Sequence, residues 1–172
     1  MKSALPVFET ANELMAHMKS GIFLNTRANG VDNTMIIGWG GITFLWGRPM
    51  MLVLVRDNRA TYPLLEASQV FTLSVPSGVD MTRQIRICGT KSGRDIDKFS
   101  VCELQKGQAD KVDAPIVLNC PLHYECVIQY QQRLDSDALP ELVQNTYYAP
   151  GNGHLHTLFF ADIVAAYRTD AI

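Results

Sequence analysis

The sequence predicts a mainly β protein that forms a barrel rather than a parallel α/β sheet. Strand-like segments outnumber helical ones, the helical segments are short, and glycine-rich turns separate the elements. No G-x-G-x-x-G motif precedes a helix, so a Rossmann nucleotide domain is not expected. The strand-like segments are residues 22–26, 33–37, 50–55, 70–75, 121–133 and 155–167.

The N-terminal elements follow from periodicity and turn chemistry. Residues 10–18 read as a short helix with Leu14 and Met18 on one face, and Gly21 ends it. Asn29-Gly30 tolerates positive φ and predicts a turn, which makes residues 22–39 a hairpin.

The middle of the chain alternates strands with short helices. The apolar run 50–55 predicts a strand buried on both faces, and Thr61 and Pro63 are placed to start a helix. Residues 70–75 alternate with period two, with apolar residues on one face and Thr72 and Ser74 on the other. A second helix is expected over residues 80–88, with Asp80 as its cap.

The C-terminal half is read as two long strands and two loops. Residues 103–114 and 138–153 are polar or turn-rich and predict loops, the second ending in a sharp turn at 150–153. The strand 155–167 is apolar on both faces, so it should be central in the sheet.

Bulk composition describes an ordinary globular chain of 172 residues, with 47% hydrophobic and 19% charged residues. The net charge of −2 provides no basic field for nucleic acid, and no apolar run is long enough for a membrane span. The four cysteines form no C-x-x-C pair, and neither a signal peptide nor a zinc spacing is visible. We therefore expect reduced thiols, no metal, and a cytoplasmic location.

The stretch from Asn33 to Thr61 carries the first candidate site. Three glycines surround Trp39, and glycine within a strand often marks a close approach of ligand to backbone. Arg56, Arg59 and Thr61 follow, with chemistry suited to a phosphate. The stretch predicts a flat ligand with a phosphate tail; the alternative is a barrel corner followed by a solvated turn.

A second candidate site lies at residues 88–99. It contains two glycines, two hydroxyls and three basic side chains, a composition suited to anion binding. It is not a Walker A loop, because the G-x-x-x-x-G-K-[ST] order is absent. The alternative is a polar connector.

Both stretches resemble one known family. The motifs N-T-M-x-x-G-W-G-G, R-P-M and V-R-x-x-R-x-T, followed by C-G-T-x-S-G-R-D-x-D-K-F, are similar to those of the flavin reductase-like, FMN-binding split-barrel family, which includes flavoredoxins. The chain departs from the family pattern where Met50 stands for a second proline and where Asp57 stands for a proline. The resemblance implies a six-stranded antiparallel Greek-key split β-barrel with peripheral helices, formed as a single FMN-binding domain over residues 1–172. It also implies a homodimer that shares the flavin pocket.

The resemblance assigns the site residues. His156, just before the last strand, would lie near the flavin and stabilise negative charge on the reduced ring. The alternatives are a histidine at the barrel rim or, with His154, the start of a metal site. The cofactor-binding residues would be Asn33, Met35, Gly38, Trp39, Gly40, Arg56, Arg59, Thr61, Lys91, Ser92, Gly93, Arg94 and Lys98.

Three functions fit this assignment. The first is an enzyme, an NAD(P)H-dependent flavin reductase that transfers electrons through bound FMN. The second is a flavoredoxin-like carrier that accepts electrons from a protein partner. The third is a split-barrel protein that has lost its cofactor. No nucleic-acid or membrane partner is expected.

Overall fold

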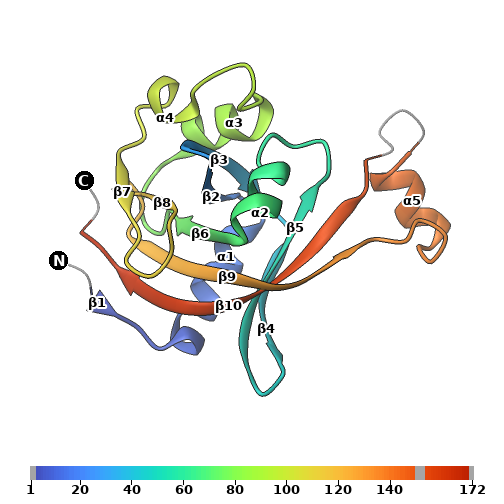
Figure 1. Cartoon of the computed structure of the whole chain (residues 1–172), viewed down its shortest axis with the longest axis horizontal. Helices are drawn as coiled ribbons and strands as arrows, with labels where there is room; N and C mark the ends of the chain where they lie inside the picture. The colour runs from blue at the N-terminus through green and yellow to red at the C-terminus, as the bar shows by residue number, and fades with distance from the viewer. Residues whose placement is uncertain (1–2, 150–153, 171–172) are drawn as a thin grey trace.

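The computed structural model describes residues 3–149 and 154–170, which form a curved antiparallel sheet with helices at its ends and sides (Figure 1). The strands are β1 (Ser3–Ala4), β2 (Ile22–Ala28), β3 (Val31–Ile37), β4 (Gly40–Leu45), β5 (Arg48–Arg56), β6 (Val70–Val75), β7 (Lys106–Gln108), β8 (Pro115–Val117), β9 (Leu122–Arg133) and β10 (His156–Arg168). The helices are the 3-10 helix η1 (Val7–Thr10), α1 (Ala11–Met18), α2 (Tyr62–Ser68), α3 (Thr82–Thr90), α4 (Lys98–Val101) and α5 (Glu141–Tyr147).

The main sheet confirms the mainly β, antiparallel fold. Its strand order is β3-β2-β6-β9-β10-β5-β4, and β1 pairs with the far part of β10. The two ends of this order, β3 and β4, do not pair with each other within the described residues, so the barrel is open. The six expected strands are all present, and β10 is central as predicted. The sheet has eight strands instead of six because β1 and β4 join it.

Two tight turns connect the hairpins. Asn29 and Gly30 have φ of 52° and 75° between β2 and β3, as the Asn-Gly pair predicted. Trp46 and Gly47 have the same pair of φ values, 52° and 75°, between β4 and β5. Sequence analysis did not predict β4, since a tryptophan is an unusual residue for a left-handed turn position.

The apolar core lies on the concave face of the sheet. Leu14 and Met18 of α1 pack there with Phe71, Leu73 and Tyr124. A second apolar cluster lies beneath α3 and α4 and includes Phe23, Cys88, Phe99, Cys102 and Cys120. Helices α3 and α4 are therefore held against the outer side of β2 and β3.

The two faces of β6 alternate as predicted, and the outer face, which carries Thr72 and Ser74, is buried as well. Thr72 and Ser74 are fully buried and accept hydrogen bonds from Asn25 Nδ2, at 3.0 and 3.2 Å. Thr72 also donates to the carbonyl of Pro115, which brings β8 across this face. The polar residues that alternate along β6 therefore join two layers instead of facing water.

Some segments differ from the predictions. In β5, Leu52 and Leu54 are only half-buried, so one face of this strand is partly open. The expected loop 103–114 contains β7, which pairs with β8, and the expected loop 138–153 contains α5. The sharp turn predicted at 150–153 lies outside the described residues.

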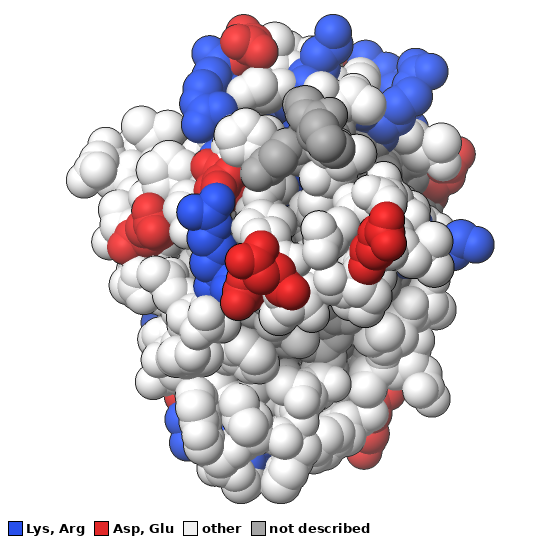
Figure 2. Space-filling view, turned by 90° about the vertical axis from the view of Figure 1, so that its right-hand side faces the viewer, with Lys and Arg blue, Asp and Glu red and all other residues white. Residues whose placement is uncertain are grey.

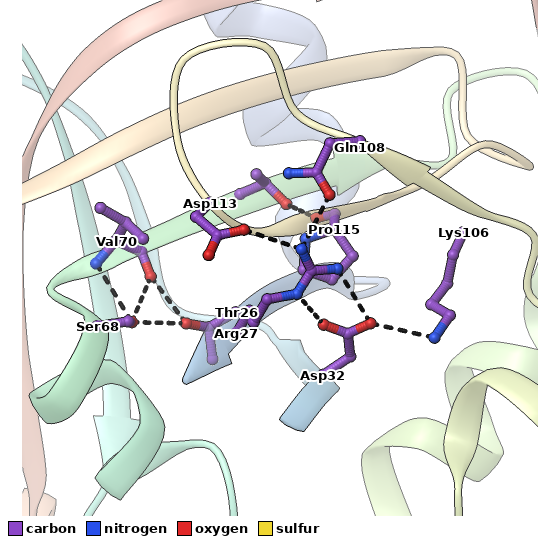
Figure 3. A network of polar contacts seen from close by, with 10 residues as sticks. Thr26, Arg27, Asp32, Ser68, Val70, Lys106, Gln108, Asp113 and Pro115 are labelled. Atoms are coloured by element: carbon purple, nitrogen blue, oxygen red, sulfur yellow. Dashed lines mark hydrogen bonds and ion pairs between the residues drawn. The ribbon is translucent and has the colours of Figure 1, made fainter. Parts of the chain in front are cut away.

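A charged network ties β7 and β8 to the β2–β3 hairpin (Figure 3). Arg27 donates to Asp32 at 2.6 Å and to Asp113 at 2.9 Å, and Lys106 lies 3.1 Å from Asp32. Burial would raise the pKa of Asp32, but its bonds to Arg27 and Lys106 lower the pKa below the ordinary value. The network holds the start of β3, where the candidate site begins.

The β9 and β10 strands extend beyond the barrel and carry α5 at their far end (Figure 1). No residue of α5 is buried in the chain. Within the described residues, no helix is both long enough and apolar enough to cross a membrane.

Candidate functional site

The two predicted stretches meet at one cavity of about 170 Å³. Strand β3 and the turn after β5 form one side of it, and the segment from the end of α3 to the start of α4 forms the other. Its lining residues are Asn33, Met35, Ile36, Asn58, Arg59, Ala60, Thr61, Cys88, Gly89, Thr90, Lys91, Ser92, Gly93, Arg94 and Lys98.

The floor of this first cavity is built around Asn33. Its side-chain amide donates to Thr61 Oγ1 at 2.9 Å, so the Thr61 hydroxyl is used here and does not cap α2. Gly93 packs directly on the amide, because a Cβ at this position would lie 2.3 Å from Asn33 Oδ1. The glycine thus allows the 91–98 segment to approach β3.

Hydrogen bonds shape the 91–98 segment. Ser92 Oγ accepts from the backbone N–H of Arg94 at 3.1 Å, and the Arg94 guanidinium donates to the carbonyl of Asn58 at 2.9 Å. Asp97 caps α4 by accepting from the backbone N–H of Phe99 at 3.0 Å. The segment is therefore joined to the turn after β5 across the cavity.

Positive charge gathers in the first cavity. Lys98 is buried and donates to the carbonyl of Cys88 at 2.7 Å. Burial lowers the pKa of Lys98, and the nearby charge of Arg59 lowers it further, while Cys88 acts in the opposite direction. The side chains of Arg59 and Lys91 have no hydrogen-bond or ion-pair partner among residues 3–149 and 154–170. An anion in this cavity would relieve the repulsion among these cations.

One buried polar atom lines the same cavity without a partner. Asn58 Oδ1 is inaccessible to solvent and makes no hydrogen bond within the described part of the chain. Buried polar atoms are normally paired, so this amide is available to a ligand with a complementary polar group.

A second cavity of about 160 Å³ adjoins the first. Met35, Ile36 and Arg59 line both cavities. The remaining residues of the second cavity are mostly apolar or aromatic: Ile37, Gly38, Trp39, Leu54, Arg56 and His156. Each cavity is smaller than a typical small-molecule site, so an extended ligand would occupy both.

Two rings, those of Trp39 and His156, line the second cavity, and a third ring supports them. The rings of Trp39 and His156 lie 4.6 Å apart between centroids, and Tyr147 packs edge-on against Trp39 at 5.1 Å. Such an aromatic lining suits a planar aromatic ligand.

His156 is neutral in this setting. Burial lowers its pKa to about 4, and the charges of Arg56 and Arg59 act in the same direction. Its Nδ1 atom lies 2.8 Å from the hydroxyl of Tyr148. A neutral imidazole whose Nδ1 accepts a hydrogen bond carries its proton on Nε2 and can donate from there.

Arg56 fastens the end of α5 over this cavity. Its guanidinium donates to the carbonyl of Tyr147 at 2.9 Å and lies 5.3 Å from the centre of the Tyr148 ring. A cation at a helix C-terminus is favourable, because the last carbonyls point toward it. Arg56 is therefore used to hold α5 rather than presented to the first cavity.

The structure distributes the predicted site residues between the two cavities. Asn33, Thr61, Lys91, Ser92, Gly93, Arg94 and Lys98 line the first, Gly38, Trp39, Arg56 and His156 line the second, and Met35 and Arg59 line both. Gly40 lines neither; it lies in β4, where a Cβ would come within 2.2 Å of the Leu52 carbonyl.

The two histidines of the H-x-H motif have separate partners. His154 Nδ1 lies 2.7 Å from Asp57 Oδ1, whereas His156 faces Tyr148. In the part of the chain that the structure describes, no three His, Cys, Asp or Glu side chains are grouped to hold a metal ion.

Sequence reasoning missed several lining or supporting residues. Asn58 lies within the predicted arginine turn and could have been included for its amide. Tyr147 and Tyr148 lie in a segment predicted as a loop, and no local pattern connects them to His156. Cys88 begins the second candidate stretch, but it was not among the predicted cofactor-binding residues.

Comparison with known proteins agrees with this geometry. The chain matches the model of the flavin reductase like domain over residues 15–171. No match was found among the curated proteins.

Several solved structures share the fold. An FMN-binding domain of a flavin reductases-like enzyme from Shewanella baltica has a TM-score of 0.68 at 21% identity, covering 98% of this chain and 77% of that one. Flavoredoxin of Desulfovibrio vulgaris also has a TM-score of 0.68, at 22% identity, covering 87% and 69%. An NADH:FAD oxidoreductase of Streptomyces globisporus has a TM-score of 0.62 at 17% identity, covering 87% and 75%. With the family model matched over nearly the whole chain, the protein belongs to the flavin reductase-like family.

Proposed function

We propose that the chain, as one domain over residues 1–172, binds FMN across the two adjoining cavities and transfers electrons through it. The observation that supports this is the chemistry of the pair: a cationic cavity and an aromatic cavity that share Met35, Ile36 and Arg59. A phosphate tail fits the first cavity and a flat ring fits the second.

The phosphate would be held in the first cavity. Arg59 and Lys91 supply charge that no described residue neutralises, and Thr61 and Ser92 supply hydroxyl groups. The donor set fits a dianion, because charge-assisted hydrogen bonds are the strong ones.

The ring would lie in the second cavity beside Trp39. FMN supplies the redox chemistry, in one- or two-electron steps. With Tyr148 donating to Nδ1, neutral His156 would carry its proton on Nε2 and donate a hydrogen bond from there. Such a donor stabilises negative charge on a reduced ring without adding a full positive charge to a buried site.

NAD(P)H is the electron donor that we propose. An NADH:FAD oxidoreductase among the structural neighbours supports a nicotinamide donor. With no G-x-G-x-x-G fingerprint in the sequence, the donor would dock against the exposed side of the ring. The second candidate is a carrier reduced by a protein partner, and the likeness to flavoredoxin supports it.

We further propose a homodimer formed through the β4–β5 hairpin. Phe44 and Trp46 are 64% and 55% exposed, and Trp46 packs edge-on against Tyr130, which is itself exposed. Figure 2 shows that the lower half of this face is largely uncharged. That half lies at the same height as the hairpin in Figure 1. Uncharged aromatic surface of this kind is typical of protein interfaces. Light scattering should give twice the chain mass, and Trp46→Glu should give the monomer.

The compartment that we propose is the cytoplasm, because the four cysteines of the sequence suit a reducing environment.

An anaerobic titration tests the function. The protein loaded with FMN is mixed with NADH or NADPH, and the flavin absorbance is followed. Rapid bleaching by either nucleotide supports the reductase. Bleaching by dithionite but by neither nucleotide supports the carrier, and failure to bind FMN at micromolar concentration contradicts both.

A further inference from the structure

Two buried thiols lie in contact beside the first cavity. The Sγ atoms of Cys88 and Cys102 are 3.6 Å apart. Cys88 lies in the last part of α3, and Cys102 follows the last residue of α4. Both side chains are buried in the cluster beneath these helices.

We propose that Cys88 and Cys102 are a reversible thiol–disulfide pair, oxidised by hydrogen peroxide, whose bond closes the 89–101 segment beside the cavity. The proposal depends on the two sulfurs and on access through the first cavity, so it is tested on the ligand-free chain and does not depend on the identity of the ligand.

The geometry favours an intramolecular bond. A disulfide has its sulfurs about 2.05 Å apart, so side-chain rotation must bring these two closer by about 1.5 Å. Lys98, the first residue of α4, donates to the Cys88 carbonyl at 2.7 Å and so holds α4 to α3 near the thiols. Because both sulfurs are buried, a second protein chain has no route to either one.

Access differs between the two thiols. Cys88 lines the first cavity, whereas Cys102 does not and is fully buried. A small oxidant entering the cavity would therefore meet Cys88 first. Cys102 is then the resolving thiol, in contact behind it.

The reaction balances with peroxide as the oxidant. The Cys88 thiolate attacks one peroxide oxygen and breaks the O–O bond, giving a sulfenic acid and water after proton uptake. The Cys102 sulfur then displaces the sulfenic oxygen as a second water, and the S–S bond forms. The two thiols lose two electrons and two protons in total, and the peroxide is reduced to two waters.

Burial keeps the first step slow. It raises the pKa of the Cys88 thiol to about 12, with Cys102 acting in the same direction, while the Lys98 charge opposes them. Only the thiolate reacts, so the pair responds to sustained rather than brief exposure.

Peptide mapping tests the pair directly. The reduced full chain is treated with hydrogen peroxide, remaining thiols are alkylated under denaturing conditions, and the chain is digested with trypsin. Trypsin separates Cys88 in peptide 87–91 from Cys102 in peptide 99–106, while Cys120 and Cys126 share peptide 112–133. We expect peptide 87–91 linked to 99–106, lost again after dithiothreitol. Three results would overturn the proposal. These are a link between peptides 99–106 and 112–133, the absence of any link, and irreversible oxidation of Cys88 while Cys102 stays free.

Hydrogen exchange tests the consequence. Closing the segment removes much of the freedom of its open state, so exchange of its slower amides should fall by about tenfold or more on oxidation. Cys102→Ser should abolish the linked peptide and this slowing; Cys102→Ala serves if the serine disrupts the core. Cys120→Ser is the matched control, since Cys120 is equally buried in the same cluster, and it should retain both. Unchanged exchange in the linked protein would show that the bond does not close the segment.

Discussion

The hydroxyl of Tyr148 lies 2.8 Å from Nδ1 of His156 and joins the end of α5 to the first residue of β10. Eight positions separate the two residues along the chain. When the hydroxyl donates in this contact, the neutral imidazole accepts at Nδ1 and carries its proton on Nε2.

Tyr148→Phe should release this tautomer. We expect His156 to change from the Nε2–H form to a mixture, seen as shifted imidazole ¹⁵N resonances. The free energy of unfolding should fall by about 1 kcal/mol, the usual value of a lost hydrogen bond. Tyr147→Phe is the control, because the ring of Tyr147 contacts Trp39 and its hydroxyl has no partner within the described residues. An unchanged ¹⁵N spectrum in Tyr148→Phe would contradict the assignment.

Stability of the ligand-free protein should depend on pH through His156. Its pKa is about 4 when folded, against an ordinary value of 6.5. Between these values the unfolded chain binds the proton and the folded chain does not, so stability falls as the pH is lowered from 6.5 to 4. The difference amounts to at most about 3 kcal/mol, at 1.36 kcal/mol per pH unit. Urea unfolding at several pH values should show this dependence of the free energy of unfolding on pH. The dependence should be weaker in His156→Gln. An equal dependence in both proteins would mean that another group titrates.

Arg59→Ala should separate phosphate binding from ring binding. Riboflavin has the ring without the phosphate, and FMN should bind more tightly by about tenfold or more. The substitution should remove much of that difference and leave riboflavin affinity nearly unchanged, as measured by fluorescence quenching. Arg83→Ala, an exposed arginine of α3 outside both cavities, should leave both affinities unchanged. Equal weakening of both ligands by Arg59→Ala would mean that Arg59 serves the ring site or the fold.

Gly93→Ala should disturb the floor of the first cavity. The added Cβ would lie 2.3 Å from Asn33 Oδ1, and the buried amide can yield only by straining its bond to Thr61. We expect a stability loss of about 1–3 kcal/mol from overpacking, together with weaker FMN binding. Gly89→Ala is the matched control. Gly89 lies in helix α3, where alanine is favourable, and its added Cβ would lie 3.6 Å from the nearest atom, Cβ of Ile36. Equal melting temperatures for the Gly93→Ala and wild-type proteins would show that the amide moves freely.

Local patterns in the sequence were sufficient for most of the fold. Period-two and continuous apolar runs located the six main strands, since burial of one or both faces leaves a direct mark on residue order. The Asn29-Gly30 turn was predictable because positive φ demands such residues. The motif resemblance indicated the family before any contact was known.

The tertiary structure decided what no local pattern encodes. It joined Asn33, Thr61 and Gly93 into one floor, turned Arg56 toward α5, and left Gly40 against a neighbouring strand. It also placed Tyr148 on His156 and Cys88 against Cys102. By itself the sequence determined the strands, their turns and the family, because these depend on neighbouring residues. The contacts within the site depend on how distant segments pack, and only the folded chain brings those segments together.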